Sequence, residues 1–138
     1  MQTVLVGQVM EVIDRYKIRR EHKLLEIGCG EGRDSKTVLD HGFPLMATDI
    51  SEEAIAYCRQ QMPRYEKHFS VLDCLSARLD ETFDFIFAIA VVHMLVLDED
   101  RDDFYRFIRS HLTAEGKALI CTMGDGTAEY RSDPETAF

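Results

Sequence analysis

The sequence predicts an α/β fold, in which helices cover a layered sheet. Short apolar runs end at turn residues and alternate with stretches of helical character, a pattern typical of α/β domains. The longest apolar run, at 82–92, is typical of a buried central strand in a parallel sheet. A glycine-rich turn, Gly28-Cys29-Gly30-Glu31-Gly32, separates the first apolar run from the first following helix.

Length and charge limit the class of protein. The 138 residues are enough for one domain with a core, so we expect 1–138 to form a single domain. A formal net charge of −9 argues against nucleic acid as a partner, because such binding relies on Lys and Arg. No apolar stretch approaches the roughly 18 residues of a membrane span, so no membrane partner is expected. The first 20 residues lack a signal-peptide pattern, which indicates a cytoplasmic location.

The cysteines and histidines do not suggest a metal centre. Cys29, Cys58, Cys74 and Cys121 form no CxxC pair, and the histidines show no clustering. Neither a disulfide nor a metal site is therefore predicted.

The first half of the chain predicts two helices and two strands, followed by a third helix. Apolar residues near helical spacing indicate a first helix: Leu5, Val9, Val12, Ile13 and Tyr16. The run 23–27 predicts a strand, and a helix from about Gly32 to Asp40 ends at Gly42. The run 43–50 predicts the second strand. Ser51 is a good N-cap for a helix that stops before Pro63.

The second half predicts three further strands. They are a modest one at 67–74, the apolar one at 82–92, and one at 117–123. Between the last two, a helix begins with Asp98 as its cap and ends at Gly116, and Phe104, Phe107, Ile108 and Leu112 face the core.

The segment 124–138 is a polar tail without a strand pattern. Within it, Ser132-Asp133-Pro134-Glu135 has the form of a helix start. We therefore expect the tail to be either a truncated continuation or a segment that becomes ordered only against a partner. With no strand beyond it, the run 117–123 would expose a sheet edge and invite a homodimer.

The spacing of the glycines favours a ligand without phosphates. Dinucleotide-binding turns follow G-x-G-x-x-G/A, but Arg33 occupies the third glycine position here. Glu31 and Asp34 would also repel a pyrophosphate and suit a positively charged group. The turn therefore predicts a nucleoside-like ligand that carries a cation.

Two further carboxylates follow later strands. Asp49 ends the second strand, where it can accept hydrogen bonds from both hydroxyls of a ribose. Asp73 and Cys74 end the third strand and could bind the adenine amino group and a ring nitrogen. Ile50 and Leu75 would supply apolar walls for the ring.

These residues together resemble the class I S-adenosylmethionine-dependent methyltransferases. "LLEIGCGEG" is similar to the first motif of that family, "ATDIS" to the second and "VLDC" to the third. "FDFIFAIAVVHML" resembles the fourth motif, and "LTAEGKALI" resembles the turn into the fifth strand. The resemblance implies a Rossmann-like three-layer sandwich. Its sheet is mainly parallel, with about five strands in the order 3-2-1-4-5 and helices on both faces, and the C-terminal strands of the family are missing.

The resemblance also implies a cofactor, S-adenosyl-L-methionine, and its product S-adenosyl-L-homocysteine. Methyl transfer to a small-molecule acceptor would proceed by in-line displacement. His93 lies where the family often lines the reaction chamber and is the candidate catalytic residue. The candidate cofactor-binding residues are Glu26, Gly28, Cys29, Gly30, Asp34, Asp49, Ile50, Asp73, Cys74 and Ala88.

Simpler interpretations stay open for several of these residues. The glycines could form an ordinary tight corner, Asp49 and Asp73 could be turn residues, and His93 could be structural. A noncatalytic methyltransferase-like module that binds cofactor or associates with another protein is the alternative function. A nicotinamide-dependent dehydrogenase is disfavoured by Arg33 and by the acidic turn.

Overall fold

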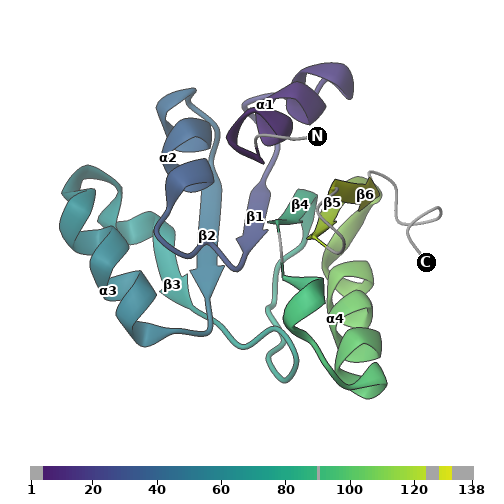
Figure 1. Ribbon diagram of the computed structural model, residues 1–138. Coiled ribbons are helices and arrows are strands. Elements are labelled where there is room, and N and C mark those ends of the chain that lie inside the picture. Colours follow the sequence, from purple (N-terminus) through teal and green to yellow (C-terminus); the bar gives the residue numbers. More distant parts are fainter. Residues whose placement is uncertain (1–4, 90, 124–127, 132–138) are drawn as a thin grey trace.

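A six-stranded sheet forms the centre of the protein, in the order β3-β2-β1-β4-β5-β6 (Figure 1). The computed structural model describes residues 5–89, 91–123 and 128–131. The strands are β1 (Leu24–Ile27), β2 (Leu45–Asp49), β3 (Phe69–Val71), β4 (Phe83–Ile89), β5 (Leu112–Met123) and β6 (Ala128–Arg131). The first five run parallel, and β6 pairs with β5 in the antiparallel direction. The predicted order of the five parallel strands is confirmed.

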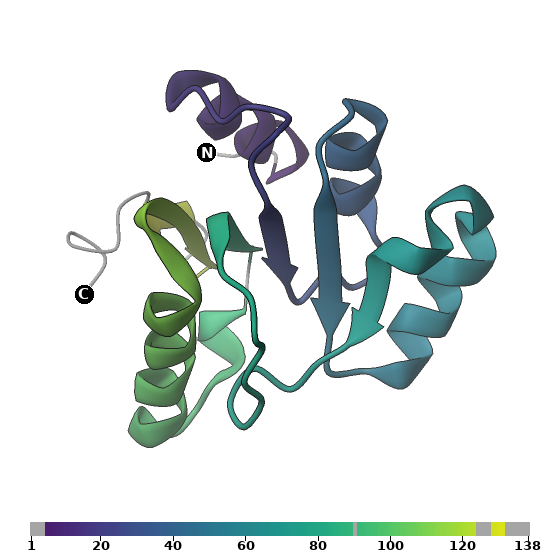
Figure 2. The ribbon, with the colours of Figure 1, turned by 180° about the vertical axis from the view of Figure 1, so that it is seen from behind.

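Helices cover both faces of the sheet, as predicted. They are α1 (Leu5–Arg15), α2 (Arg33–Asp40), α3 (Glu52–Gln61) and α4 (Asp98–His111), with short 3-10 helices η1 (Pro63–His68) and η2 (Val92–Met94). Figures 1 and 2 show α2 and α3 grouped on the side of β2 and β3, with α4 beside β4 and β5. The three-layer arrangement is therefore the Rossmann-like one.

Each face of the sheet has its own hydrophobic core. Residues of α1, α2 and α3, such as Val12, Val38 and Ile55, pack on one face against Phe85 and Phe87 of β4. On the other face the buried side of α4 packs against alternate residues of β1, β4 and β5: Leu25, Ile27, Phe83, Ile86, Ala88, Ala118 and Ile120. Strand β4 contributes to both cores, which explains why its sequence is apolar apart from Asp84.

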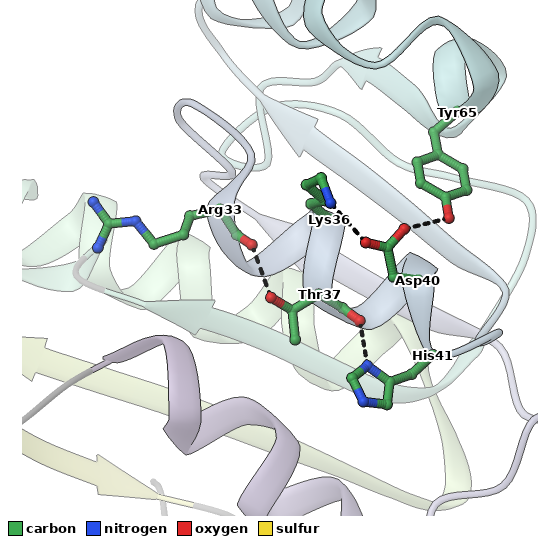
Figure 3. A network of polar contacts seen from close by, with 6 residues as sticks. All are labelled: Arg33, Lys36, Thr37, Asp40, His41 and Tyr65. Carbon is green, nitrogen blue, oxygen red and sulfur yellow. Dashed lines mark hydrogen bonds and ion pairs between the residues drawn. The ribbon is translucent and has the colours of Figure 1, made fainter.

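Polar contacts fix the outer surface of α2 (Figure 3). Asp40 accepts hydrogen bonds from Lys36 Nζ (2.8 Å) and from the Tyr65 hydroxyl (2.6 Å), which links α2 to η1. Within α2, the Thr37 hydroxyl donates to the Arg33 carbonyl. The Thr37 carbonyl in turn bonds to the His41 ring (2.7 Å). These contacts run along the helix that follows the glycine turn and hold it in place.

The predictions for the end of α2 and the start of α3 are confirmed, whereas those for the two ends of α4 are wrong. Ser51 caps α3 by accepting a hydrogen bond from Ala54 N (3.1 Å), and Gly42 follows α2 with φ of 87°, as predicted. The predicted cap Asp98 is wrong: Leu97 is the N-cap of α4, and Asp98 is its first residue and pairs with Arg101.

The predicted helix end at Gly116 is also wrong. Helix α4 ends at His111 and β5 begins at Leu112, which pairs with Phe83 of β4. The Thr113 hydroxyl donates to Asp84 (3.2 Å) and so ties this part of the chain to β4. The register with β4 shifts between Phe83 and Phe85, so that Gly116 lies inside the strand. Tertiary pairing therefore overrides the local stop signal.

Strand β6 corrects the prediction that no strand follows residue 123. It pairs with Ile120–Met123 of β5, so the outer edge of that part of β5 is occupied within the chain. The edge on which the homodimer prediction depended is therefore covered from Ile120 to Met123, and the homodimer stays a prediction. The predicted helix start at 132–135 and the side chain of Leu5 lie outside the described residues. None of the helices in the described ranges has the length and apolar character that crossing a bilayer requires.

Candidate functional site

The glycine turn between β1 and α2 has a left-handed backbone at each glycine. The φ angles of Gly28, Gly30 and Gly32 are 79°, 56° and 84°, which residues with a Cβ rarely adopt. The carbonyl of Thr48 in β2 accepts hydrogen bonds from Gly28 N (2.8 Å) and Cys29 N (2.9 Å). The turn is therefore fixed to the carboxyl end of the neighbouring strand.

The three glycines differ in what surrounds them. A Cβ on Gly28 would lie 2.5 Å from Cγ2 of Val91. A Cβ on Gly32 would lie 2.7 Å from Cε of Met62 and 3.0 Å from Sγ of Cys58. A Cβ on Gly30 would meet nothing within 4 Å. The turn is therefore packed from below at two glycines and open at the third, where a ligand can approach the backbone.

Glu26 lies beneath the turn and is almost completely buried. Its residue surface is 3% exposed, and its Oε1 accepts a hydrogen bond from the Ser35 hydroxyl (2.5 Å). Burial raises the pKa of Glu26 to about 8, with smaller contributions from the charges of Asp34 and Asp49, while the Ser35 hydrogen bond opposes the rise. Glu26 therefore connects β1 to α2, and its role toward a cofactor stays a prediction.

Asp34 has a carboxylate oxygen without a partner. Its Oδ1 is buried and makes no hydrogen bond within the described part of the chain. Burial raises the pKa of Asp34 to about 6, and the charge of Arg33 lowers it. A buried acceptor with no donor is costly to leave unsatisfied, so this oxygen is suited to a cationic or N–H group of a ligand.

Asp49 connects the turn to the next helix. Its Oδ2 accepts from Gly30 N (2.9 Å) and its Oδ1 accepts from Ser51 N (2.9 Å). Each carboxylate oxygen has a second lone pair, so the group can still accept from the two hydroxyls of a ribose. The next residue, Ile50, is 65% exposed and forms an open apolar surface beside this carboxylate.

Asp73 organises a turn after β3. Its carboxylate accepts from Leu75 N (3.0 Å) and from the Ser76 hydroxyl (3.1 Å), which is the turn role that the sequence left open. Cys74 is partly buried, and burial raises the pKa of its thiol to about 11. The role of both residues toward an adenine stays a prediction.

The last two candidates lie on the β4 side of the turn. Ala88 is fully buried inside β4, and its side chain belongs to the core beneath α4. His93 lies in η2, directly after β4, and its side chain is outside the described residues. Their roles toward the cofactor and the reaction also stay predictions.

Sequence reasoning missed four residues that shape the turn. Thr48 accepts its N–H groups, Ser35 binds Glu26, Cys58 donates to the Gly30 carbonyl (3.2 Å), and Val91 packs on Gly28. Burial also raises the pKa of the Cys29 thiol, so this cysteine is a packed residue of the turn. Only Thr48 carried a signal, because it precedes Asp49 at the end of a predicted strand.

Taken together, these residues fit a cationic nucleoside. The turn offers an open backbone at Gly30, Asp49 offers hydroxyl acceptors, and Asp34 offers an unsatisfied carboxylate oxygen. No group of three or more His, Cys, Asp or Glu residues among those described could hold a metal ion.

The comparison with protein families agrees with this geometry. A family described as "Methyltransferase domain" matches residues 25–118, which include β1 to β4 and the first part of β5. The chain belongs to the methyltransferase domain family. The resemblance to class I S-adenosylmethionine-dependent methyltransferases is thereby confirmed, and so is the fold.

The similar proteins are longer than this methyltransferase domain. A probable S-adenosyl-L-methionine-dependent methyltransferase, TehB of Haemophilus influenzae, is 29% identical over 112 residues. The match covers 80% of this chain and 39% of TehB, so the chain spans about two fifths of that relative. A tRNA (carboxymethyluridine(34)-5-O)-methyltransferase of Saccharomyces cerevisiae is 34% identical over 97 residues, which cover 70% of this chain and 33% of that protein.

Solved structures match most of the domain. A TehB-like SAM-dependent methyltransferase from Corynebacterium glutamicum superimposes with a TM-score of 0.69 at 29% identity, over 84% of this chain and 61% of that one. The glycopeptide N-methyltransferase MtfA in complex with S-adenosyl-L-methionine gives a TM-score of 0.69 at 22% identity, over 84% and 50%. The predicted cofactor is therefore the cofactor of this family.

Proposed function

We propose that this methyltransferase domain binds S-adenosyl-L-methionine at the glycine turn and transfers its methyl group to a small-molecule acceptor. The observation that carries the proposal is the buried Oδ1 of Asp34, which has no partner among the described residues, beside a turn that is open at Gly30. When bound, this cofactor supplies a methyl group that is already activated by a sulfonium.

Each proposed contact follows from the chemistry of one residue. Asp49 would accept from the ribose hydroxyls, and Ile50 would contact the adenine. Asp34 would accept from the amino group of the ligand, which satisfies its orphan oxygen. Glu26 would hold the turn from beneath, and Asp73, Cys74 and Ala88 would complete the contacts.

The protein needs little acid–base machinery for this reaction. Because the methyl group is activated, the work of the residues is to align the two reactants in line and to exclude water. His93 is the candidate base wherever the acceptor must lose a proton, since an imidazole titrates near neutral pH. Because one of the relatives is a tRNA methyltransferase, the class of acceptor has to be determined by experiment.

Titration calorimetry with S-adenosyl-L-methionine and with S-adenosyl-L-homocysteine tests the binding part. We expect Asp49→Asn to weaken both affinities by about tenfold, because an amide accepts at only one of its two terminal atoms. Asp102→Asn, which changes an exposed residue of α4, serves as the matched control and should leave both affinities unchanged. A folded sample that releases no heat with either ligand would contradict the proposal.

A further inference from the structure

Exposed apolar side chains are concentrated directly after β4. Met94, Val96 and Leu97 are 72%, 83% and 54% exposed, and they occupy four consecutive positions together with Leu95. We call these three side chains the apolar rim. Large apolar groups in water are unfavourable, and a contiguous set of them indicates a surface that meets a partner.

The backbone beneath the apolar rim is held in place. The Arg101 guanidinium in α4 donates to the carbonyl of Leu95 and, more weakly, to that of Val96 (3.4 Å), and it pairs with Asp98. Backbone hydrogen bonds from Met94 N to Val91 O (3.0 Å) and from Leu95 N to Val92 O (2.9 Å) close η2. The rim is therefore an ordered surface, which is what binding without a large entropy cost requires.

Val91 connects the rim to the glycine turn, because its carbonyl accepts a hydrogen bond from Met94 N (3.0 Å). Val91 starts this segment, and its Cγ2 occupies the space next to Gly28. Strand β1 lies between β2 and β4 in the sheet, so Asp49 and Ile50 lie on one flank of the turn and Val91 lies on the other. The rim therefore lies on the β4 flank of the turn, opposite the flank on which Asp49 would hold a ribose.

The charge around the rim selects among acceptors. Asp98, Glu99 and Asp100 form the first turn of α4 directly after Leu97, and Arg101 pairs with Asp98. On the other side, the turn contributes Glu31, and the start of α2 contributes Asp34 together with the positive charge of Arg33. These carboxylates repel an anionic group, while a neutral or positively charged molecule is tolerated or attracted.

We infer that the apolar rim binds the apolar body of the methyl acceptor, and that this acceptor is a neutral or cationic small molecule with an aromatic or aliphatic group. The inference rests on the proposed function, because it places the acceptor next to the cofactor. It excludes a polyanionic acceptor such as an RNA phosphate backbone at this surface.

Two fluorescent probes with the same aromatic skeleton test both parts of the inference. N-phenyl-1-naphthylamine is neutral, and 8-anilinonaphthalene-1-sulfonate carries a sulfonate. With the chain saturated by S-adenosyl-L-homocysteine, we expect saturable binding of the neutral probe and at least about threefold weaker binding of the sulfonate. The double variant Met94→Ser/Val96→Ser should weaken the neutral probe by at least about fivefold.

A matched control separates binding of the probe at the apolar rim from nonspecific binding to other exposed apolar side chains. Tyr57→Ser removes a side chain that is 45% exposed on α3, and it should change probe binding by less than about twofold. Both altered side chains of the double variant are mostly exposed, so the fold should persist, and calorimetry should give an unchanged affinity for S-adenosyl-L-homocysteine.

Three results would overturn the inference: equal binding of the neutral probe to the double variant, tighter binding of the sulfonate, or a dimer of the unchanged chain that the double variant converts to a monomer. The last would identify a second copy as the occupant of the rim. Failure of S-adenosyl-L-homocysteine to bind would instead contradict the proposed function, so the two failures are distinguishable.

Discussion

Glu26 is the residue whose acid–base chemistry the fold changes most. Its carboxylate is buried beneath the turn with a single side-chain donor, the hydroxyl of Ser35. Because burial penalises the charged form, the pKa of Glu26 rises from 4.5 to about 8. The group is therefore mostly protonated in the folded chain at neutral pH and ionised in the unfolded chain.

This difference makes the free energy of unfolding depend on pH. A raised folded-state pKa contributes stability that is complete below about 4.5 and is lost as the pH rises through about 8. The raised pKa of Asp34 also lowers the free energy of unfolding as the pH rises to about 6. Between about pH 6.5 and 8, the contribution of Glu26 should therefore lower the free energy of unfolding, by at most about 1.4 kcal/mol per pH unit.

Glu26→Gln isolates this effect, since glutamine resembles the protonated acid and can still accept from Ser35. Urea unfolding at several pH values should show a flatter profile for Glu26→Gln than for the unchanged chain. Glu53→Gln, at an exposed position in the first turn of α3, should keep the slope of the unchanged chain. Parallel profiles for all three proteins would contradict the raised pKa.

Single residues also show what the sequence could and could not predict about the site. Asp49 was predictable because it ends an apolar run, and in an α/β sheet the ends of such runs meet at the ligand side. Cys58 and Val91 were not, because each approaches the turn only through tertiary packing, from α3 and from the segment after β4. A local pattern contains no information about such contacts.

At the scale of elements, the β1–α2 turn combines strain with packing. Alanine at Gly30 would add only the cost of a left-handed backbone, about 1–2 kcal/mol. Alanine at Gly32 would add the same strain and, in addition, a clash with Met62 and Cys58. We therefore expect Gly32→Ala to lower the free energy of unfolding by more than Gly30→Ala.

Urea unfolding of the two variants measures this difference, and Gly30→Ala is the matched control because its φ is also positive. Equal losses of stability would show that the side chains of Met62 and Cys58 move away from the added Cβ at no cost in free energy. Gly30→Ala should nevertheless weaken binding of S-adenosyl-L-homocysteine, since its Cβ would enter the space through which a ligand approaches the backbone.

The predictions from sequence failed at the edge of the sheet that β5 and β6 form. The apolar run 117–123 identified the end of β5, but its start at Leu112 depends on pairing with Phe83 across a shifted register. The polar composition of 124–138 gave no sign of β6, because an edge strand gains its stability from the ladder with β5 more than from apolar residues. The parallel core of the fold was predictable, and its antiparallel edge was not.

A proline in β6 tests whether this strand protects the edge. Tyr130 pairs with Cys121 of β5, and Tyr130→Pro removes a backbone N–H from this short strand. We expect the variant to uncover part of β5 and to associate at rising concentration, as measured by sedimentation velocity. Tyr130→Ala, which keeps the N–H, should behave like the unchanged chain. Identical sedimentation of the two variants would contradict a protective role.

At the scale of the whole molecule, the charge distribution bears on the choice of ligand. The chain carries a formal net charge of −9, and the carboxylates of Asp34 and Asp49 lie at the turn within that field. S-adenosyl-L-methionine has a sulfonium that S-adenosyl-L-homocysteine lacks, so the two ligands differ by one positive charge at nearly equal shape. The field of the protein should therefore favour the charged cofactor over its neutral product.

Ionic strength separates this long-range attraction from the local contacts. Salt shortens the Debye length from about 10 Å at 0.1 M to a few Å at higher concentration, which screens the distant carboxylates and leaves the buried ones largely unscreened. Calorimetry at low and at high sodium chloride should show the affinity for S-adenosyl-L-methionine falling by about threefold or more, and that for S-adenosyl-L-homocysteine by less than about 1.5-fold. Equal losses for both ligands would mean that the acidic field plays no part in selecting the cofactor. A preference for S-adenosyl-L-methionine that persists at high salt would then be due to the buried carboxylates at the turn.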